Sequence, residues 1–322
     1  MTDSNDQKPD FYQRRRKAAV FFLPIILIVW ICAYLYYRNQ PPAYAPPQSA
    51  STAPSIDNVK KVVALTPSLT ETFWALNPEP SDYKLVATSP FTQDPRAQNL
   101  LRLDSAGSLE QIVALRPALV LQHPVDSRLR EQLESMHIPT LSYAMDTLED
   151  IDRAITDIAE HINQKDRAEI LLDIIHRDLK RNAEQFGANK TPRDILIIVD
   201  RLDARLLQFY TAQAPAYLAD LVEGCGYKAI QVSSDAWARI SAEQLIELNP
   251  ERILFIAHDI DDAEFIHSEM RKLYPTLQAV TQNRLFLYYD GHDKPKLTVP
   301  GPNIADAQYS LCSSLEIIYG SR

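Results

Sequence analysis

The side chains that most often carry out chemistry are present in this 322-residue sequence, but they are not spaced for catalysis or for holding a metal ion. None of the seven histidines pairs with another at the H-x-x-x-H spacing of a metal site. The sequence contains no G-x-G-x-x-G, G-x-x-x-x-G-K, G-x-S-x-G or H-E-x-x-H motif, and seven glycines are poor material for a phosphate-binding loop. No catalytic triad or acid–base pair can be assembled. The sequence therefore predicts no catalytic residues, no metal ligands and no cofactor.

The composition is typical of a globular protein that does not bind nucleic acid. Apolar residues make up 46% of the chain and charged residues 23%, which suits a buried core with a solvated surface. The net charge is -9, whereas binding to a phosphate backbone requires a basic face.

An uncharged apolar run near the start indicates the compartment. Residues 18–37 carry no charge and, at 1.5 Å per residue, span a hydrocarbon core of about 30 Å. Arg14, Arg15, Arg16 and Lys17 precede the run. The positive-inside rule then predicts a single-pass anchor in the inner membrane, with residues 1–17 cytoplasmic and the remainder periplasmic.

Three other interpretations of this run are weaker. A cleaved signal peptide has an apolar core of about 7–15 residues, and its possible A-x-A site at residues 43–45 is followed by Pro46. A lipid-attachment signal at Cys32 would have small residues before the cysteine, but Trp30 and Ile31 stand there. A buried helix of a soluble domain is the weakest, because no soluble-domain pattern surrounds the run.

Residues 38–58 are rich in proline, alanine and serine, which predicts an extended tether between the membrane and the globular part. Beyond the membrane run, the remaining cysteines are Cys225 and Cys312. In an oxidising compartment this even pair forms either a disulfide or two buried free thiols, and the sequence does not choose between them.

The remaining residues, 59–322, alternate short apolar runs with helical patterns, which predicts an α/β fold with mostly parallel sheets. Residues 108–121 and 241–254 share one pattern, S-x-E-Q followed by a leucine and a proline. Each copy is typical of an N-cap serine, a short helix, a proline stop and a buried strand. This duplication predicts two similar lobes. The expected strands are Val62–Thr66, Leu85–Thr88, Leu119–Gln122, Ile195–Asp200, Ile253–Ile256 and Leu285–Tyr289.

A long helical pattern over residues 147–186 separates the two copies. Unbroken, it would extend about 58 Å and would join an N-terminal lobe (59–146) to a C-terminal lobe (187–322). The alternative is two consecutive helices, broken near residues 163–165.

The segment Lys61–Glu71 (KVVALTPSLTE) resembles the opening strand and turn of the helical-backbone periplasmic binding proteins, which serve importers of iron siderophores, haem and vitamin B12. The similarity is strongest to the vitamin B12-binding members and covers nearly all of residues 59–322. It implies two Rossmann-like lobes joined by one long helix, with a largely pre-formed ligand cleft between them. Five further stretches agree in order: Leu85–Pro95, Ser108–Leu121, Phe209–Gly226, Trp237–Pro250 and Pro302–Cys312.

The resemblance also implies ligand-contacting residues. Phe91 and Trp237 match aromatic positions of the family cleft, Tyr210 lies near another, and Asn303 stands where vitamin B12-binding members carry an arginine. Flat, stiff aromatic rings suit a large planar or apolar ligand, although core packing is the ordinary role of such residues.

Two other departures from those members, at residues 104–107 and 288–293, leave the ligand open among a corrinoid, a siderophore and another tetrapyrrole. A negatively charged siderophore would call for arginines, and the candidates, each more typical of a solvated surface charge, are Arg96, Arg102, Arg201, Arg205 and Arg239. A minor alternative comes from distant relatives that bind bare metal ions, and it would use His123 and His258.

Glu110 and Glu243 occupy the second helical position of the two repeated units. The helix dipole favours a carboxylate there by about 0.3–1 kcal/mol, which is a sufficient structural reason. The resemblance implies a second role, which is docking to arginines of a permease dimer of the ABC type. A ligand-sensing or scaffold ectodomain without a transport partner is the alternative function, and an extracytoplasmic enzyme on this scaffold lacks any motif.

Overall fold

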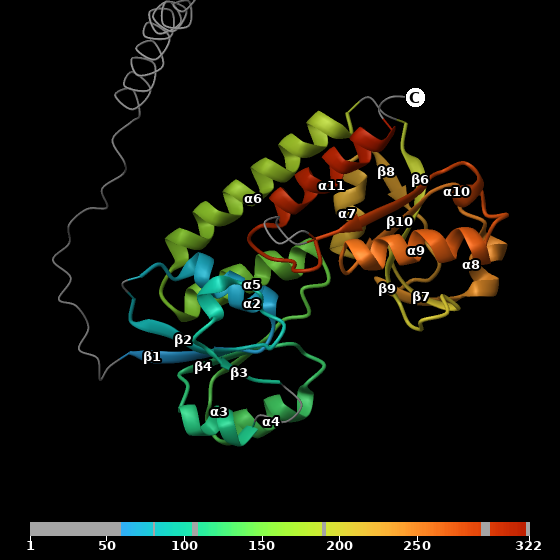
Figure 1. Cartoon of the computed structure of the whole chain (residues 1–322). Helices are drawn as coiled ribbons and strands as arrows, with labels where there is room; N and C mark the ends of the chain where they lie inside the picture. Colours follow the sequence, from blue (N-terminus) through green and yellow to red (C-terminus); the bar gives the residue numbers. More distant parts are fainter. Residues whose placement is uncertain (1–58, 80, 105–108, 189–190, 291–296, 320–322) are drawn as a thin grey trace, which may run out of the picture. The chain divides into compact units, whose positions relative to one another are not determined.

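The computed structural model describes residues 59–319 apart from 80, 105–108, 189–190 and 291–296 (Figure 1). The predicted anchor at 18–37 and the tether at 38–58 lie outside these residues. Within the described part of the chain, no helix combines the length and apolar character needed to cross a membrane.

The first sheet is parallel throughout, with strand order β3-β2-β1-β4-β5. Its central strands are buried on both faces, as the runs of valine, leucine and alanine require. Figure 1 shows helices on both sides of this sheet, with α2 and α5 on one face and α3 and α4 on the other. The strands are β1 (Lys60–Ala64), β2 (Tyr83–Thr88), β3 (Leu101–Arg102), β4 (Leu119–Gln122) and β5 (Thr140–Ser142); the helices are α2 (Pro67–Leu76), η2 (Pro95–Ala97), α3 (Leu109–Leu115), α4 (Ser127–Ser135) and α5 (Leu148–His161).

The second sheet is mixed, with order β11-β10-β6-β7-β9 and β8 paired to β6. All six expected strands are present across the two sheets, so the predicted α/β class is confirmed. The antiparallel ribbon of β7 and β9 was not expected. The strands are β6 (Arg193–Arg201), β7 (Gln208–Ala212), β8 (Tyr227–Ala229), β9 (Trp237–Ser241), β10 (Ile253–Ala257) and β11 (Leu285–Tyr289); the helices are α7 (Tyr217–Gly224), α8 (Ala242–Leu248), α9 (Ile260–Leu273), α10 (Gln278–Thr281) and α11 (Ile304–Tyr319).

The repeated sequence units are also repeated in the backbone. Each forms a seven-residue helix, α3 or α8, followed by a buried strand, β4 or β10. Arg116 and Asn249 stand eight residues after the two serines, and both adopt a positive φ, of 50° and 41°. A left-handed residue is a common helix terminator, and the proline that follows prevents continuation.

The prediction of one unbroken helix over 147–186 was wrong. The segment forms α5 and then α6 (Lys165–Phe186), the alternative that the pattern had left open. Asn163 adopts φ 58°, a conformation that asparagine tolerates, and the N–H of Gln164 closes the end of α5 on the carbonyl of Ala159 at 2.7 Å. A capping box between Thr147 and Asp150 begins α5. The 22 residues of α6 extend about 33 Å.

A continuous apolar core links the two sheets through a layer of helices. It extends from Val62 on β1 through Ile155 and Ile175 on α5 and α6 to Leu221 on α7 and Leu254 on β10. A backbone hydrogen bond of 2.8 Å from the Tyr217 N–H to the Asp146 carbonyl adds a direct connection. Because interiors packed in this way resist deformation, the two halves are expected to move little relative to each other.

Candidate functional site

An aromatic pair lies on the β7–β9 ribbon. Tyr210 and Trp237 stack with ring centroids 6.1 Å apart and an angle of 12° between the ring planes. Tyr217, at the start of α7, packs edge-on against Trp237. The two ring centroids are 6.0 Å apart and the ring planes form an angle of 65°. The three rings are therefore fixed by one another before any ligand binds.

The pleat of the ribbon decides which side chains join the pair. Tyr210 pairs with Arg239, and Ala212 pairs with Trp237, so these four residues share one face of the ribbon. Phe209 and Ile240 alternate to the other face, where they are buried in the core of the second sheet.

Arg239 is exposed beside Tyr210, level with Asp200 at the carboxyl end of β6. The other arginine candidates are differently placed: Arg201 pairs with Asp262 at 2.6 Å and Arg102 donates to the carbonyls of Ser89 and Thr92. Arg239 is therefore a free guanidinium, among the described residues, that adjoins the aromatic pair.

The indole N–H of Trp237 is buried and meets no acceptor of ordinary hydrogen-bond geometry among the described residues. The carboxyl group of Asp146 is its polar neighbour. Burial raises the pKa of Asp146, and the Trp237 N–H and the nearby His123 oppose that rise. The buried Trp237 N–H is therefore directed toward a half-buried carboxyl group.

Tyr217 closes the polar side of the cluster. Burial raises the pKa of its phenol well above the usual range, with Asp290 and Asp146 adding to the effect. The phenol therefore stays protonated, and it donates to the carbonyl of Leu297 at 3.0 Å. Asp290 in turn accepts from the Leu297 N–H at 2.8 Å.

Phe91 lies apart from this cluster. It follows β2 on the carboxyl edge of the first sheet and is 77% exposed, and no ring contact joins it to Tyr210 or Trp237 among the described residues. Val125, which follows β4 on the same edge, is also 77% exposed. Both apolar side chains are therefore largely in water.

A model of the family described as periplasmic binding protein matches residues 62–290. The chain belongs to the periplasmic binding protein family. The resemblance predicted from the sequence is thereby confirmed, and the family is one of substrate-binding proteins rather than enzymes.

Relatives of this periplasmic binding protein are named for two kinds of ligand. The vitamin B12-binding protein of Pectobacterium carotovorum subsp. carotovorum is 25% identical over 201 residues, 61% of this chain and 70% of that protein. The high-affinity heme uptake system protein IsdE of Staphylococcus aureus is 22% identical over 222 residues, 67% of this chain and 70% of that protein. The crystal structure of the periplasmic vitamin B12 binding protein BtuF of Vibrio cholerae shares the fold, with a TM-score of 0.64 and 19% identity over 81% of this chain and 98% of that one.

Other expected site residues of this periplasmic binding protein are dispersed. Asn303, just before α11, donates to Glu71 on α2 at 3.4 Å, so it lies at a junction of the two halves and not beside the aromatic pair. Glu110 and Glu243 are exposed in the first turns of α3 and α8. A hydrogen bond from the Ser241 hydroxyl lowers the pKa of Glu243, which keeps that carboxylate charged.

Cys225, at the end of α7, and Cys312, on α11, are joined in a disulfide with a Cα–Cα distance of 5.0 Å. No group of three His, Cys, Asp or Glu side chains that could hold a metal ion occurs in the described part of the chain. His258 lies 3.6 Å from Asp200, and His123 belongs to the surroundings of Asp146 on the other sheet.

Proposed function

We propose that this chain is a membrane-anchored extracytoplasmic solute-binding protein that captures a cobalamin-, tetrapyrrole- or ferric-siderophore-like ligand and delivers it to an ABC permease dimer. Family membership supports binding as the activity. Relatives named for vitamin B12 and for heme support a large, largely planar ligand.

The observation that carries the proposal is the stacked pair Tyr210–Trp237 with Arg239 on the same face of the ribbon. Parallel rings offer a flat apolar surface at low entropic cost, which matches the face of a macrocycle or a chelate. The guanidinium beside them is suited to a carboxylate or phosphate at the edge of that ligand. The half-buried carboxyl group of Asp146 can serve amide or hydroxyl groups on the same edge.

The support for a pre-formed site is the packing beneath the rings. Trp237 packs against the shared core and contacts Tyr217. Its side chain therefore loses little conformational entropy when the ligand binds. Binding free energy is then not consumed in immobilising the site. Phe91 and Val125 are highly exposed and belong to the N-terminal lobe. We propose that the bound ligand covers them on its opposite side from the aromatic pair.

The docking role of Glu110 and Glu243 is supported by their exposure and by the matching helix positions of the two repeated units. Rim charges of this kind steer encounter and orientation more than they add affinity. The anchor at residues 18–37 is supported by the uncharged apolar run and the basic residues before it. Alkaline carbonate extraction of membranes tests the anchor, because an integral chain stays in the pellet and a cleaved chain is released.

A ligand panel tests the binding function. The full-length chain in a nonionic detergent is titrated by calorimetry with cyanocobalamin, haem and ferric siderophores of several chemical types. Saturable binding to one class, at micromolar or tighter affinity, is the expected result. No heat with any member of the panel contradicts the proposal.

A further inference from the structure

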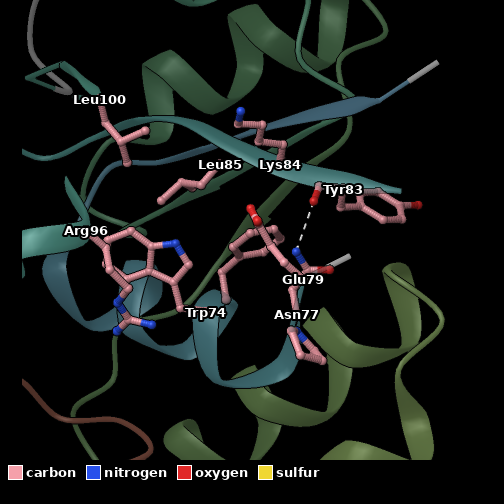
Figure 2. Close-up of a pocket in the computed structure, with 10 residues that line it drawn as sticks. Trp74, Asn77, Glu79, Tyr83, Lys84, Leu85, Arg96 and Leu100 are labelled. Atoms are coloured by element: carbon pink, nitrogen blue, oxygen red, sulfur yellow. Dashed lines mark hydrogen bonds between the residues drawn. The ribbon is translucent and has the colours of Figure 1, made fainter. Parts of the chain in front are cut away.

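A separate pocket of about 420 Å³ opens on the first sheet between the last turn of α2 and β2 (Figure 2). Its walls are mainly apolar, with Phe73 and Leu85 buried and Trp74 and Leu100 half-buried. The volume lies in the range of pockets for small ligands. None of these four residues belongs to the aromatic cluster of the second sheet.

Trp74 is held in a fixed orientation by Arg96, whose guanidinium carbon lies 4.3 Å from the centre of the indole. Both carboxylate oxygens of Asp94 accept from that guanidinium, with Nη2 to Oδ2 at 2.7 Å and Nε to Oδ1 at 3.0 Å. The charge of Arg96 is thus largely compensated by Asp94. The face of the indole that Arg96 covers is therefore already occupied by a cation.

The charge that the pocket presents to a ligand is negative. Among the described lining residues, Glu79 and Lys84 are charged side chains without a recorded partner. Side chains alternate along a strand, so Lys84 projects away from the face that carries Tyr83 and Leu85. Figure 2 shows its amino group on the other side of β2 from Trp74, whereas Glu79 lies on the same side as Trp74. The carboxylate of Glu79 is therefore the uncompensated charge on this side.

The carboxyl end of α2 also favours a positively charged ligand. The last carbonyl groups of a helix carry partial negative charge and favour cations. One of them, the carbonyl of Ala75, already accepts a hydrogen bond of 2.6 Å from Arg167 Nε. The amide of Asn77 is occupied, since its Nδ2 donates to the Tyr83 carbonyl at 3.0 Å and its Oδ1 accepts from the Ser81 hydroxyl.

We propose that this pocket is a second ligand site that binds a small organic cation with apolar substituents, such as an alkylated ammonium. Trp74, Phe73 and Leu85 would contact the apolar part and Glu79 the charge. A bare divalent metal ion does not suit it, because such ions require several oxygen ligands and Glu79 is the one lining carboxylate.

Choline and its neutral isostere 3,3-dimethylbutan-1-ol test the proposal without any mutation. Calorimetric titration of the full-length chain in a maltoside detergent is expected to show choline binding about tenfold more tightly than the alcohol. Equal affinities, or no heat with choline, would overturn the assignment.

Three variants locate the site. Glu79→Gln is expected to reduce choline affinity to that of the alcohol, and Trp74→Phe to weaken both probes. Glu131→Gln, which removes an exposed carboxylate on α4 outside the pocket, is the matched control and is expected to change choline affinity by less than about twofold. Choline affinity that survives Glu79→Gln contradicts the proposal, and circular dichroism checks that each variant is folded.

Discussion

The two sheets present aromatic residues in opposite ways. On the second sheet, Tyr210, Trp237 and Tyr217 contact one another and rest on the shared core. On the first sheet, Phe91 is 77% exposed and stands alone. A ring that is already packed loses little freedom when a ligand covers it, whereas an exposed ring must be ordered at that moment. The second sheet is therefore expected to supply most of the binding free energy, and the first sheet to complete the enclosure.

Variants of Glu110 and Glu243 test whether both halves of the protein are needed for docking to the permease. Glu110→Ala combined with Glu243→Ala is expected to abolish uptake in cells while leaving ligand affinity unchanged, because both side chains are exposed and lie outside the aromatic cluster. Each single variant is expected to retain partial uptake. The assay measures accumulation of the ligand that the panel identifies, and full uptake by the double variant would remove the docking role.

Removal of the disulfide tests how much this cross-link stabilises the second half of the protein. Cys225→Ser with Cys312→Ser opens a loop closed over 87 residues. The free energy of unfolding is expected to fall by about 4 kcal/mol. Urea denaturation of the full-length chain measures the change, and Cys32→Ser is the matched control. An unchanged unfolding midpoint would mean that the cross-link contributes nothing to this half.

Trp237→Ala breaks the preformed surface itself. Ligand affinity is expected to fall by roughly 30–100-fold, about 2–3 kcal/mol, because the stacked surface and the buried N–H are lost together. Calorimetry measures the loss, and Trp74→Phe, which changes a tryptophan of α2 outside the aromatic cluster, is the control. A loss of less than threefold would show that the pair is ordinary packing.

Phe91→Ala tests how much the first sheet contributes to ligand affinity. Its ring is already in water, so stability is expected to stay within about 0.5 kcal/mol of the unmodified protein. Ligand affinity is expected to fall less than about fivefold, around 1 kcal/mol or below. Ile170→Ala, which truncates an exposed apolar side chain on α6 outside the site, is the matched control. An effect as large as that of Trp237→Ala would reverse the assignment of the two sheets.

Most of the fold was predictable because its signals are local. Buried parallel strands appear as apolar runs, and the repeated S-x-E-Q units fold into matching helix–strand pairs. The β7–β9 ribbon was missed because its strands alternate apolar with polar residues, as in Arg239-Ile240-Ser241. The break between α5 and α6 depends on one asparagine with a positive φ, inside a pattern that otherwise continues.

The site was predictable only in part. The resemblance singled out Tyr210 and Trp237, and the structure places them in contact. It could not supply Asp146, which reaches Trp237 from 91 positions away through the junction with Tyr217. Nor could it single out Arg239 among five candidate arginines, because that choice depends on strand register and on which guanidinium groups are already paired. Partnerships of this kind are set by tertiary contacts and leave no local signal.

A structure of the chain with the tightest ligand of the panel tests the central claim most directly. The account predicts the ligand's flat face against Tyr210 and Trp237, with a polar group of the ligand within hydrogen-bond distance of Arg239. A ligand bound elsewhere, with this aromatic pair left uncovered, would contradict it.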